Sequence, residues 1–523
     1  MTITASADTE KRLLGKNAVW FLSGLCIFLY LFFLNATVDL RGFNTDDPAA
    51  YLGRAISLWR GHGYGEMFAY GFFPVTIQTP GFSLLLAPIV GLFGANFVAL
   101  KLFMVLTAGL MAMAAYHYFR YFLPVKDDAP WATILLMASP VVFGLSHRIL
   151  AEIPLTIFIM LALTHLDGYL KEGGNLLNRR LVWSAACLIV AYFFKPTSIS
   201  VFVGGLLLGF HPRFRTVATW KKIFFCGFLV AVPIVVWKHY CSTVPHVWFW
   251  TTSEKDLLIY HFPGGPEHGL LTVSDWMMRI RHNIVWGMAG NIGTAIVAPL
   301  FFIQAHMIGF LLGMAVVIGM GAMWAVSFRD APSVQEGFVL FGLTILMLVS
   351  EGLAVRYMEM FYPVFIVYAF RAGSRFMPRG LLRSTARTLL GFAVVTTTVT
   401  AIDQHRRPFG NEVLAAYVDL ANNAKRQFPA DSLCFAPLTS HWQAMTLHLC
   451  GKYDHDGSLT PNKTDKSYYV IPTETGIQAS AQSSLEDKGV MRAAMEIQHA
   501  LREMGVALTT AYRNKYFALV SIR

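Results

Sequence analysis

Residues 97–119 read FVALKLFMVLTAGLMAMAAYHYF, an apolar run whose only acidic or strongly basic residue is Lys101. A helix needs about 20 predominantly apolar residues to cross a bilayer, so this stretch alone predicts a transmembrane segment. Ten further apolar segments recur on either side of it, at residues 18–34, 131–145, 153–170, 182–194, 197–210, 223–237, 308–328, 337–350, 360–370 and 388–402. The sequence therefore predicts an α-helical polytopic membrane protein with about 11 transmembrane helices.

The composition agrees with this fold class. Of 523 residues, 55% are apolar and 14% charged, and the mean hydropathy is +0.50, which is too apolar for a water-soluble protein of this length. The net charge of +11 does not indicate nucleic acid, because cytoplasmic loops of membrane proteins are rich in Lys and Arg. The six cysteines lack metal-ligand spacing, although an oxidising compartment would permit a disulfide between Cys434 and Cys450.

The basic residues also predict the topology. Turns rich in Lys and Arg near residues 120–126, 171–180, 213–222 and 371–387 are expected in the cytoplasm. With the N-terminus inside, the parity of crossings puts residues 35–96, 146–151, 195–196 and 238–283 on the outer face. That parity requires residues 81–94 to form a re-entrant or interfacial helix. Residues 1–402 are then a multi-pass membrane domain, and residues 403–523 a small soluble α/β domain on the outer face.

The first outer loop carries a pair of acids. Asp46 and Asp47 precede Pro48, which suits the first turn of a juxtamembrane helix, and Tyr51 and Arg54 follow. Either aspartate can act simply as the helix N-cap. The alternative is chemical, because a carboxylate within hydrogen-bonding reach of a hydroxyl can take its proton as the oxygen attacks an electrophile.

Further charges lie at the outer ends of apolar segments. They are Glu152 at the start of one segment, Lys195 in the turn before Pro196, and three cations or titratable groups at His147, Arg148 and Arg356. A charge at the edge of the hydrocarbon is costly unless it is hydrated or paired, which makes these residues candidates for a functional site. Ion pairing of Glu152 with Arg148 and snorkelling of Lys195 remain open as simpler interpretations.

In the order of these motifs the sequence resembles the lipid-carrier-dependent glycosyltransferases of the GT-C fold, especially the protein O-mannosyltransferase and lipid A aminoarabinose transferase branch. The resemblance rests on Asp47-x-x-x-Tyr51, on Thr79-Pro80-Gly81 before an apolar helix, and on three later motifs: Glu152 before Pro154, Phe194-Lys195-Pro196-Thr197, and Arg356-Tyr357 before Pro363. It implies that Asp47 is the catalytic base and that Glu152, where the family usually has Asp, shapes the site.

The resemblance implies a polyprenyl-phosphate sugar as donor and an envelope glycan or lipid as acceptor. Cations such as Lys195, Arg148 and Arg356 suit the leaving phosphate, and direct displacement predicts inversion at the anomeric carbon. No metal or other cofactor is required by the residues. Two alternatives stay open: a transporter or flippase for a lipid-linked sugar, and a glycan polymerase or ligase that uses a polyprenyl-diphosphate donor.

Overall fold

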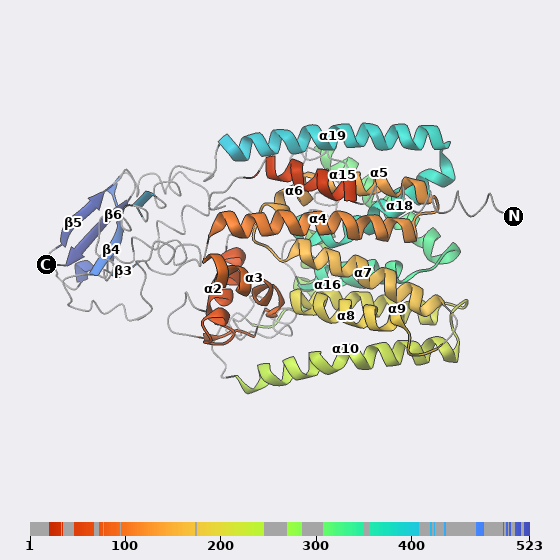
Figure 1. Ribbon diagram of the computed structural model, residues 1–523, viewed down its shortest axis with the longest axis horizontal. Helices are drawn as coiled ribbons and strands as arrows, with labels where there is room; N and C mark the ends of the chain where they lie inside the picture. The colour runs from red at the N-terminus through yellow and green to blue at the C-terminus, as the bar shows by residue number, and fades with distance from the viewer. Residues whose placement is uncertain are drawn as a thin grey trace. The chain divides into compact units, whose positions relative to one another are not determined.

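The computed structural model describes most of the membrane domain and short pieces of the rest of the chain (Figure 1). The described residues are 20–32, 34, 46–66, 73–76, 78–94, 96–172, 175–244, 269–284, 307–349, 355–406, 419–420, 423, 433–435, 467–474, 495, 498–499, 501–503, 508–513 and 517–522. They divide between two compact units. The first comprises Met1–Leu34, Thr76–Phe82 and Lys101–Ile402, and the second comprises Asn35–Val75, Ser83–Leu100 and Asp403–Arg523.

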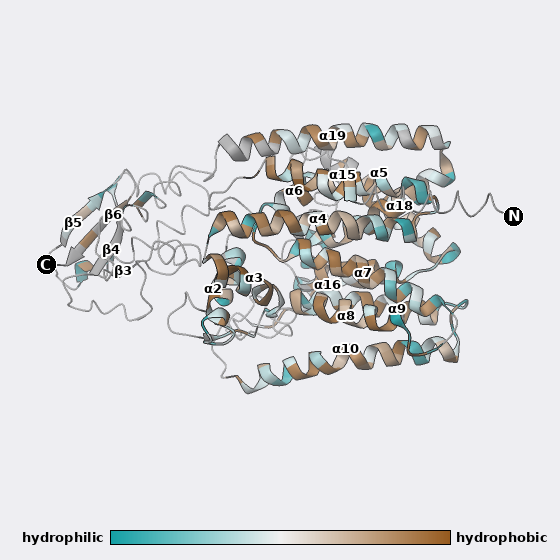
Figure 2. Cartoon of the chain, viewed as in Figure 1, coloured by the Kyte–Doolittle hydropathy of each residue, from teal (hydrophilic) through white to brown (hydrophobic). Residues whose placement is uncertain are grey.

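The first unit is built from helices, and each of the eleven predicted apolar segments coincides with one or two of them. They are Trp20–Phe32, α4 (Phe97–Phe122), α5 (Ala129–Met137), α6 (Pro140–Ser146), α7 (Glu152–Lys171), α8 (Arg179–Phe194), α9 (Ser200–Phe210), α10 (Val217–Thr243), α15 (Met307–Asp330), α16 (Val334–Val349), α18 (Tyr362–Phe376) and α19 (Arg379–Arg406). The prediction of a helical protein is confirmed. Hydrophobic residues dominate the lengths of α7, α8 and α9 in Figure 2.

The number of membrane crossings stays a prediction. Within the described part of the chain, three helices are individually long and apolar enough to span a membrane, namely α4, α7 and α10. A fourth span is possible if α5 and α6 are taken together, since these two helices are bent by 64°. Shorter apolar helices at Trp20–Phe32, Gly81–Phe93, Pro196–Phe210 and Val334–Leu348 complete the set.

The bend between α5 and α6 corrects the expectation of one continuous segment over residues 131–145. Ser139 has an extended backbone, with φ −62° and ψ 131°, and Pro140 is the first residue of α6. A residue before proline is pushed out of the helical region by the pyrrolidine ring, so the helix must stop before Pro140 and restart in a new direction. The hydropathy of the segment does not reveal this break.

Helices α9 and α16 pack with their backbones in contact. A Cβ added at Gly337 would lie 2.5 Å from the Cα of Gly204, and one added at Gly204 would lie 2.4 Å from the carbonyl oxygen of Val334. Real Cβ atoms do not approach other atoms so closely, so only glycine fits at both positions. The two glycines therefore set the spacing of this helix pair, which is one of the main contacts in the first unit.

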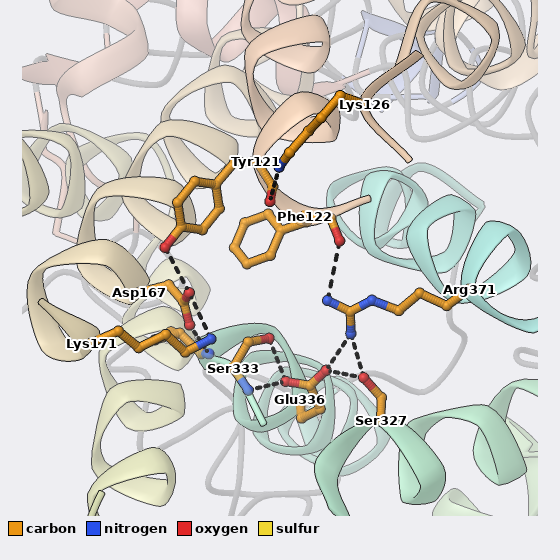
Figure 3. Close-up of polar contacts among 10 residues, drawn as sticks. Tyr121, Phe122, Lys126, Asp167, Lys171, Ser327, Ser333, Glu336 and Arg371 are labelled. Atoms are coloured by element: carbon orange, nitrogen blue, oxygen red, sulfur yellow. Dashed lines mark hydrogen bonds and ion pairs between the residues drawn. The ribbon is translucent and has the colours of Figure 1, made fainter. Parts of the chain in front are cut away.

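A buried polar network joins α4, α7, α15, α16 and α18 (Figure 3). Glu336 is fully buried. Its carboxylate accepts hydrogen bonds from the Ser333 backbone N–H and from Ser327 Oγ, both at 2.7 Å. It also forms an ion pair with Arg371 at 3.3 Å. Asp167 accepts from Tyr121 Oη at 3.0 Å and from the Val334 backbone N–H at 3.0 Å. Because both carboxylates satisfy backbone N–H groups at the start of α16, the network fixes where that helix begins.

The second unit contains α2 (Asp46–Trp59), most of α3 (Gly81–Phe93) and a small sheet. Strands β1 (Gly65–Glu66) and β2 (Phe73–Pro74) form a short antiparallel pair. Ser83 on α3 donates to the Tyr51 carbonyl oxygen at 3.1 Å. The helix at 81–94 is thus present as expected, whereas its re-entrant or interfacial position stays a prediction.

The sheet of the C-terminal segment has four strands in the order β3-β4-β6-β5. They are β3 (Leu433–Phe435), β4 (Ser467–Pro472), β5 (Leu508–Arg513) and β6 (Phe517–Ile522), and only the β3–β4 pair is parallel. The sequence predicts strands at residues 432–436, 468–471 and 516–522, which coincide with β3, β4 and β6. It does not predict β5, because the residues LTTAYR lack a strong apolar alternation. The sequence also predicts helices at 414–427 and 491–504, which lie mostly outside the described residues, as does the pairing of Cys434 with Cys450. The boundary at residue 402 stays a prediction.

Candidate functional site

Lys195 stands at a break between two helices of the first unit. Helix α8 ends at Phe194, and Lys195 is extended, with φ −152° and ψ 127°, before Pro196 opens the short 3-10 turn Pro196–Ile199. Proline imposes this break, because the preceding residue cannot stay helical. The Lys195 Nζ atom lies 2.7 Å from Glu152 Oε1. Phosphate binding and snorkelling were the two interpretations of Lys195 from the sequence, and neither specified this ion pair with Glu152.

Glu152 supplies the buried half of this ion pair. It is the first residue of α7, where a negative charge interacts favourably with the positive end of the helix dipole. Its side chain is 3% exposed and that of Lys195 is 18% exposed. Pairing with Arg148 was the simpler interpretation left open by the sequence, whereas the structure pairs Glu152 with Lys195. Among the described residues no donor reaches Glu152 Oε2, which leaves acceptor capacity on this carboxylate.

Tyr357 lies against the same ammonium group. Lys195 Nζ is 5.0 Å from the centroid of the Tyr357 ring, a cation–π distance. Tyr357 belongs to α17 (Val355–Met358), so the structure brings together three predicted site residues from three separate segments. An ammonium group carries three N–H donors, and Glu152 Oε1 takes one. The partly exposed Lys195 can therefore bind an additional anion, such as a phosphate oxygen.

Glu359 is a site residue that the sequence analysis missed. It lies in the 3-10 turn Glu359–Phe361, between α17 and α18, and this turn packs against α7. Its side chain is fully buried, and within the described part of the chain neither carboxylate oxygen has a hydrogen-bond partner. Burial raises the pKa of Glu359 well above its usual range; the Glu152 carboxylate raises it further and the Lys195 ammonium opposes the shift. Its position two residues after Tyr357 was the available signal.

His147 and Arg148 lie in the turn between α6 and α7. The two ring nitrogens of His147 are 2.8 Å from the Phe143 carbonyl oxygen and 3.0 Å from that of Tyr30. These contacts fix the imidazole between α6 and the helix Trp20–Phe32. Arg148 is buried in the same turn. Arg356, by contrast, has its backbone in α17, while its side chain lies outside the described residues.

Asp47, Tyr51 and Arg54 belong to the second unit and lie on α2, at positions spaced by four and then three residues, which places them on one helix face. Asp47 is half-buried in the first turn, while Tyr51 and Arg54 are buried. The Arg54 guanidinium carbon lies 5.9 Å from the centroid of the Tyr64 ring. The side chain of Asp46 lies outside the described residues. The expected helix beginning near Pro48 is confirmed.

A metal site was not expected from the sequence. Within the described residues no three His, Cys, Asp or Glu side chains gather in a way that could hold a metal ion. Residues 245–268, which include three of the histidines of the predicted outer loop, lie outside the described residues.

Comparison with solved structures gives the family of folds. The chain is similar to ArnT from Cupriavidus metallidurans bound to undecaprenyl phosphate, with 13% identity, a TM-score of 0.57, and coverage of 95% of this chain and 97% of that one. It is also similar to the archaeal oligosaccharyltransferase AglB from Archaeoglobus fulgidus in complex with an inhibitory peptide and a dolichol-phosphate, with 12% identity, a TM-score of 0.51, and coverage of 97% and 74%. No family model and no curated protein matches the chain. The shared architecture nevertheless spans nearly the whole sequence, and the chain has the fold of the GT-C glycosyltransferases.

Proposed function

We propose that this protein is an inverting glycosyltransferase that moves a sugar from a polyprenyl-monophosphate carrier to a hydroxyl or phosphate group of an envelope glycan or glycolipid such as lipid A. The reaction would take place at the outer face of the inner membrane, where the C-terminal domain is also expected. Its partners are then the lipid-linked donor, the acceptor and the surrounding membrane lipid, without nucleic acid.

The observation that carries the proposal is the ion pair of Lys195 with Glu152 beneath the ring of Tyr357. The buried Glu152 carboxylate holds Lys195 in place. The lysine therefore presents a positive charge where α8 ends and α7 begins. A fold shared with a protein bound to undecaprenyl phosphate makes a lipid-linked phosphate a fitting ligand for that charge. Such an arrangement stabilises charge that develops on the phosphate as the sugar leaves.

The proposed step is a single displacement. The acceptor oxygen attacks the anomeric carbon while its proton passes to the Asp47 carboxylate, which acts as general base. The bond between the anomeric carbon and the phosphate oxygen breaks, and its electron pair leaves with the polyprenyl monophosphate. Attack opposite to the leaving group inverts the anomeric configuration. Lys195 stabilises the departing phosphate, and no metal is needed for this balance of charge.

The other candidate residues have supporting roles in this proposal. Glu152 positions Lys195, and Tyr357 lies against its ammonium group. Arg148 and Arg356 add positive charge for the phosphate, while His147 positions the turn that carries Arg148. On α2, Tyr51 and Arg54 lie on the same helix face as Asp47 and would contact the sugar, with Asp46 beside them in sequence.

The test is transfer of radiolabelled sugar from a panel of polyprenyl-monophosphate donors to an envelope lipid extract. The purified protein is compared with Asp47→Asn, and Asp127→Asn in the turn Lys126–Asp128 is the matched control. The proposal expects a new glycosidic product that Asp47→Asn loses by about 100-fold or more and Asp127→Asn retains. Equal turnover by Asp47→Asn would remove Asp47 as the base.

The released lipid separates the remaining alternatives. The proposal requires a polyprenyl monophosphate, so a polyprenyl diphosphate would indicate a polymerase or ligase. Equilibration of labelled donor across vesicles without any glycosidic product would indicate a transporter.

A further inference from the structure

A cavity of the first unit lies far from the Lys195 ion pair. It has a volume of about 810 Å³ and lies between α4, α7 and the start of α8, where it is lined by His117, His165, Arg179, Arg180 and Trp183 among others. Glu152 begins α7, whereas Glu172, which follows its last residue, lines this cavity. A helix of that length is about 30 Å long, so the cavity and the ion pair lie at opposite ends of α7.

Arg180 is held in the cavity wall by two features. Its guanidinium pairs with Glu172 at 2.6 Å, and it lies directly over the backbone of α7 at Gly168. A Cβ added at Gly168 would fall 1.5 Å from Arg180 Nη1, so a larger residue at this position would displace the guanidinium. The guanidinium of Arg180 therefore lies against α7 in the cavity wall.

The charges of this cavity suit an anion. Arg179 and Arg180 are the first two residues of α8, whose N-terminus already carries the positive end of the helix dipole. Two cations at that end oppose the dipole, and Glu172 is the only acid among the lining residues that the structure describes. An anion bound beside the two arginines would interact favourably with both guanidinium groups and with the helix N-terminus.

Aromatic side chains make up much of the remaining lining, together with Leu161, Thr164 and Asn178. The rings of His117 and His165 are 6.2 Å apart, and the ring of His165 stacks on Trp183 with centroids 6.2 Å apart. Trp183 is 45% exposed. Leu177 and Val182, which are neighbours in sequence of the lining residues Asn178 and Trp183, are exposed as well. The acyl chains of a lipid can pack against such an apolar rim, whereas a small soluble anion gains nothing from it.

We propose that this cavity binds a phosphate ester, and that the exposed apolar rim favours an anionic phospholipid as its source. Basic pockets between membrane helices are known to recognise lipid phosphate groups. This inference does not depend on the proposed glycosyl transfer, because it concerns the other end of α7 and different side chains. Tyr121 links the cavity to the polar network, since its ring lines the cavity and its hydroxyl donates to Asp167 (Figure 3).

The test measures binding of three probes to the purified full-length protein by native mass spectrometry. The probes are dioctanoyl phosphatidylglycerol, dioctanoyl phosphatidylcholine and glycerol 1-phosphate. Wild type is compared with Arg179→Ala/Arg180→Ala, with Gly168→Ala, and with the control Arg215→Ala, which removes an exposed cation outside the cavity lining. Thermal unfolding of each variant confirms that it is folded.

Saturable binding of phosphatidylglycerol is expected, weakened about tenfold or more in the double variant. Gly168→Ala should weaken it too, because it displaces Arg180 without removing any charge. Arg215→Ala should bind as wild type does. Binding of glycerol 1-phosphate with the same variant profile would support the phosphate site and assign it to a soluble ester. Equal affinity for phosphatidylcholine, or unchanged binding in both cavity variants, would overturn the proposal.

Discussion

At the scale of single residues, the buried ion pair between Lys195 and Glu152 makes a clear prediction. In Lys195→Met the Glu152 carboxylate loses its buried partner, so we expect the free energy of unfolding to fall by about 3 kcal/mol. In Glu152→Gln/Lys195→Met neither charge is left, and much of that stability should return. Chemical denaturation of the three proteins measures the difference.

The same variants separate stability from ligand binding. The double variant has no positive charge at this position, so its affinity for a polyprenyl phosphate should stay low even though its stability recovers. If recovery of stability also restored binding, Lys195 would be a structural residue only.

Glu359 gives a prediction about how the stability of the protein depends on pH. Because burial raises its pKa in the folded protein, the folded state binds a proton more tightly than the unfolded state does. Its contribution to stability is therefore full at low pH and is lost as the pH rises through the folded-state pKa. Glu359→Gln lacks this titration, so its melting temperature should rise relative to wild type between about pH 5 and about pH 8.

The control for this pH effect is Glu503→Gln, since Glu503 is an exposed carboxylate. Its melting temperature should follow that of wild type at every pH. A constant difference between Glu359→Gln and wild type across the range would mean that the pKa of Glu359 is not raised in the folded state.

The sequence singled out several candidate site residues but could not assign their contacts. Glu152, Lys195 and Tyr357 were all identified, because charged and aromatic residues at the edges of apolar segments are costly or conspicuous. The pairing of Lys195 with Glu152 depends on how α7 and α8 pack against each other. No local sequence pattern contains that information. Glu359 was missed because a single acid beside an apolar segment is expected to lie in water, and only tertiary packing buries it.

At the scale of elements, the glycine contact between α9 and α16 is testable by adding one methyl group. Gly337→Ala would place its Cβ 2.5 Å from the Cα of Gly204, so the helices must separate. Overpacking of this kind costs about 1–3 kcal/mol. The matched control is Gly319→Ala in α15, where a Cβ meets nothing within 4 Å. Thermal unfolding should show a loss for the first variant and no loss for the second.

The start of α16 makes another prediction. Ser333 and Glu336 form a Ser-x-x-Glu pair in which the Glu336 carboxylate accepts from the Ser333 backbone N–H and from its hydroxyl. Ser333→Ala keeps the bond from its backbone N–H but removes the hydroxyl that donates to the buried Glu336 carboxylate, so it should lower the free energy of unfolding by about 1 kcal/mol or more. Ser333→Thr keeps a hydroxyl and should preserve most of the stability; an equal loss in both variants would argue against a contribution from this hydrogen bond.

Elements were more predictable than contacts. Apolar segments gave the positions of the long helices of the first unit, because burial in lipid or protein requires apolar residues along each of them, but they did not predict the short helix α17. The break at Pro140 was missed although the proline was visible. The hydropathy of the segment stays high on both sides of the 64° bend, so it does not reveal the change of direction. Strand β5 was missed for the opposite reason, as its Thr-rich sequence pairs with β6 but carries little hydrophobic pattern.

At the scale of the whole molecule, the predicted topology can be tested by labelling single cysteines in intact cells. The six native cysteines are first replaced by serine. Leu177→Cys lies in an exposed turn beside Arg179 and is expected on the cytoplasmic side, whereas Glu503→Cys lies in the C-terminal domain expected outside. A membrane-impermeant maleimide should therefore label the second residue and spare the first. The reverse pattern would invert the topology.

The fold at this scale was predictable from the order of a few weak motifs. At 13% identity the sequence shares little with ArnT from Cupriavidus metallidurans, yet the architecture matches over 95% of the chain. Lipid accepts many apolar side chains at most positions, so hydrophobic segments diverge while their order and lengths persist. The acceptor was not predictable, because its specificity depends on loops whose sequences have no regular pattern.

The close contact of Gly204 with Gly337 has a mechanical consequence. Two helices whose backbones touch cannot slide past each other, so α9 and α16 respond to a change in bilayer thickness by tilting together. The turn that carries Lys195 leads directly into α9 and is coupled to this rigid pair. Helix α10 is mostly exposed along its apolar stretch. We therefore expect α10 to tilt more than the α9–α16 pair when lipid chain length changes, and the ion pair of Lys195 with Glu152 to keep its geometry in membranes of different thickness.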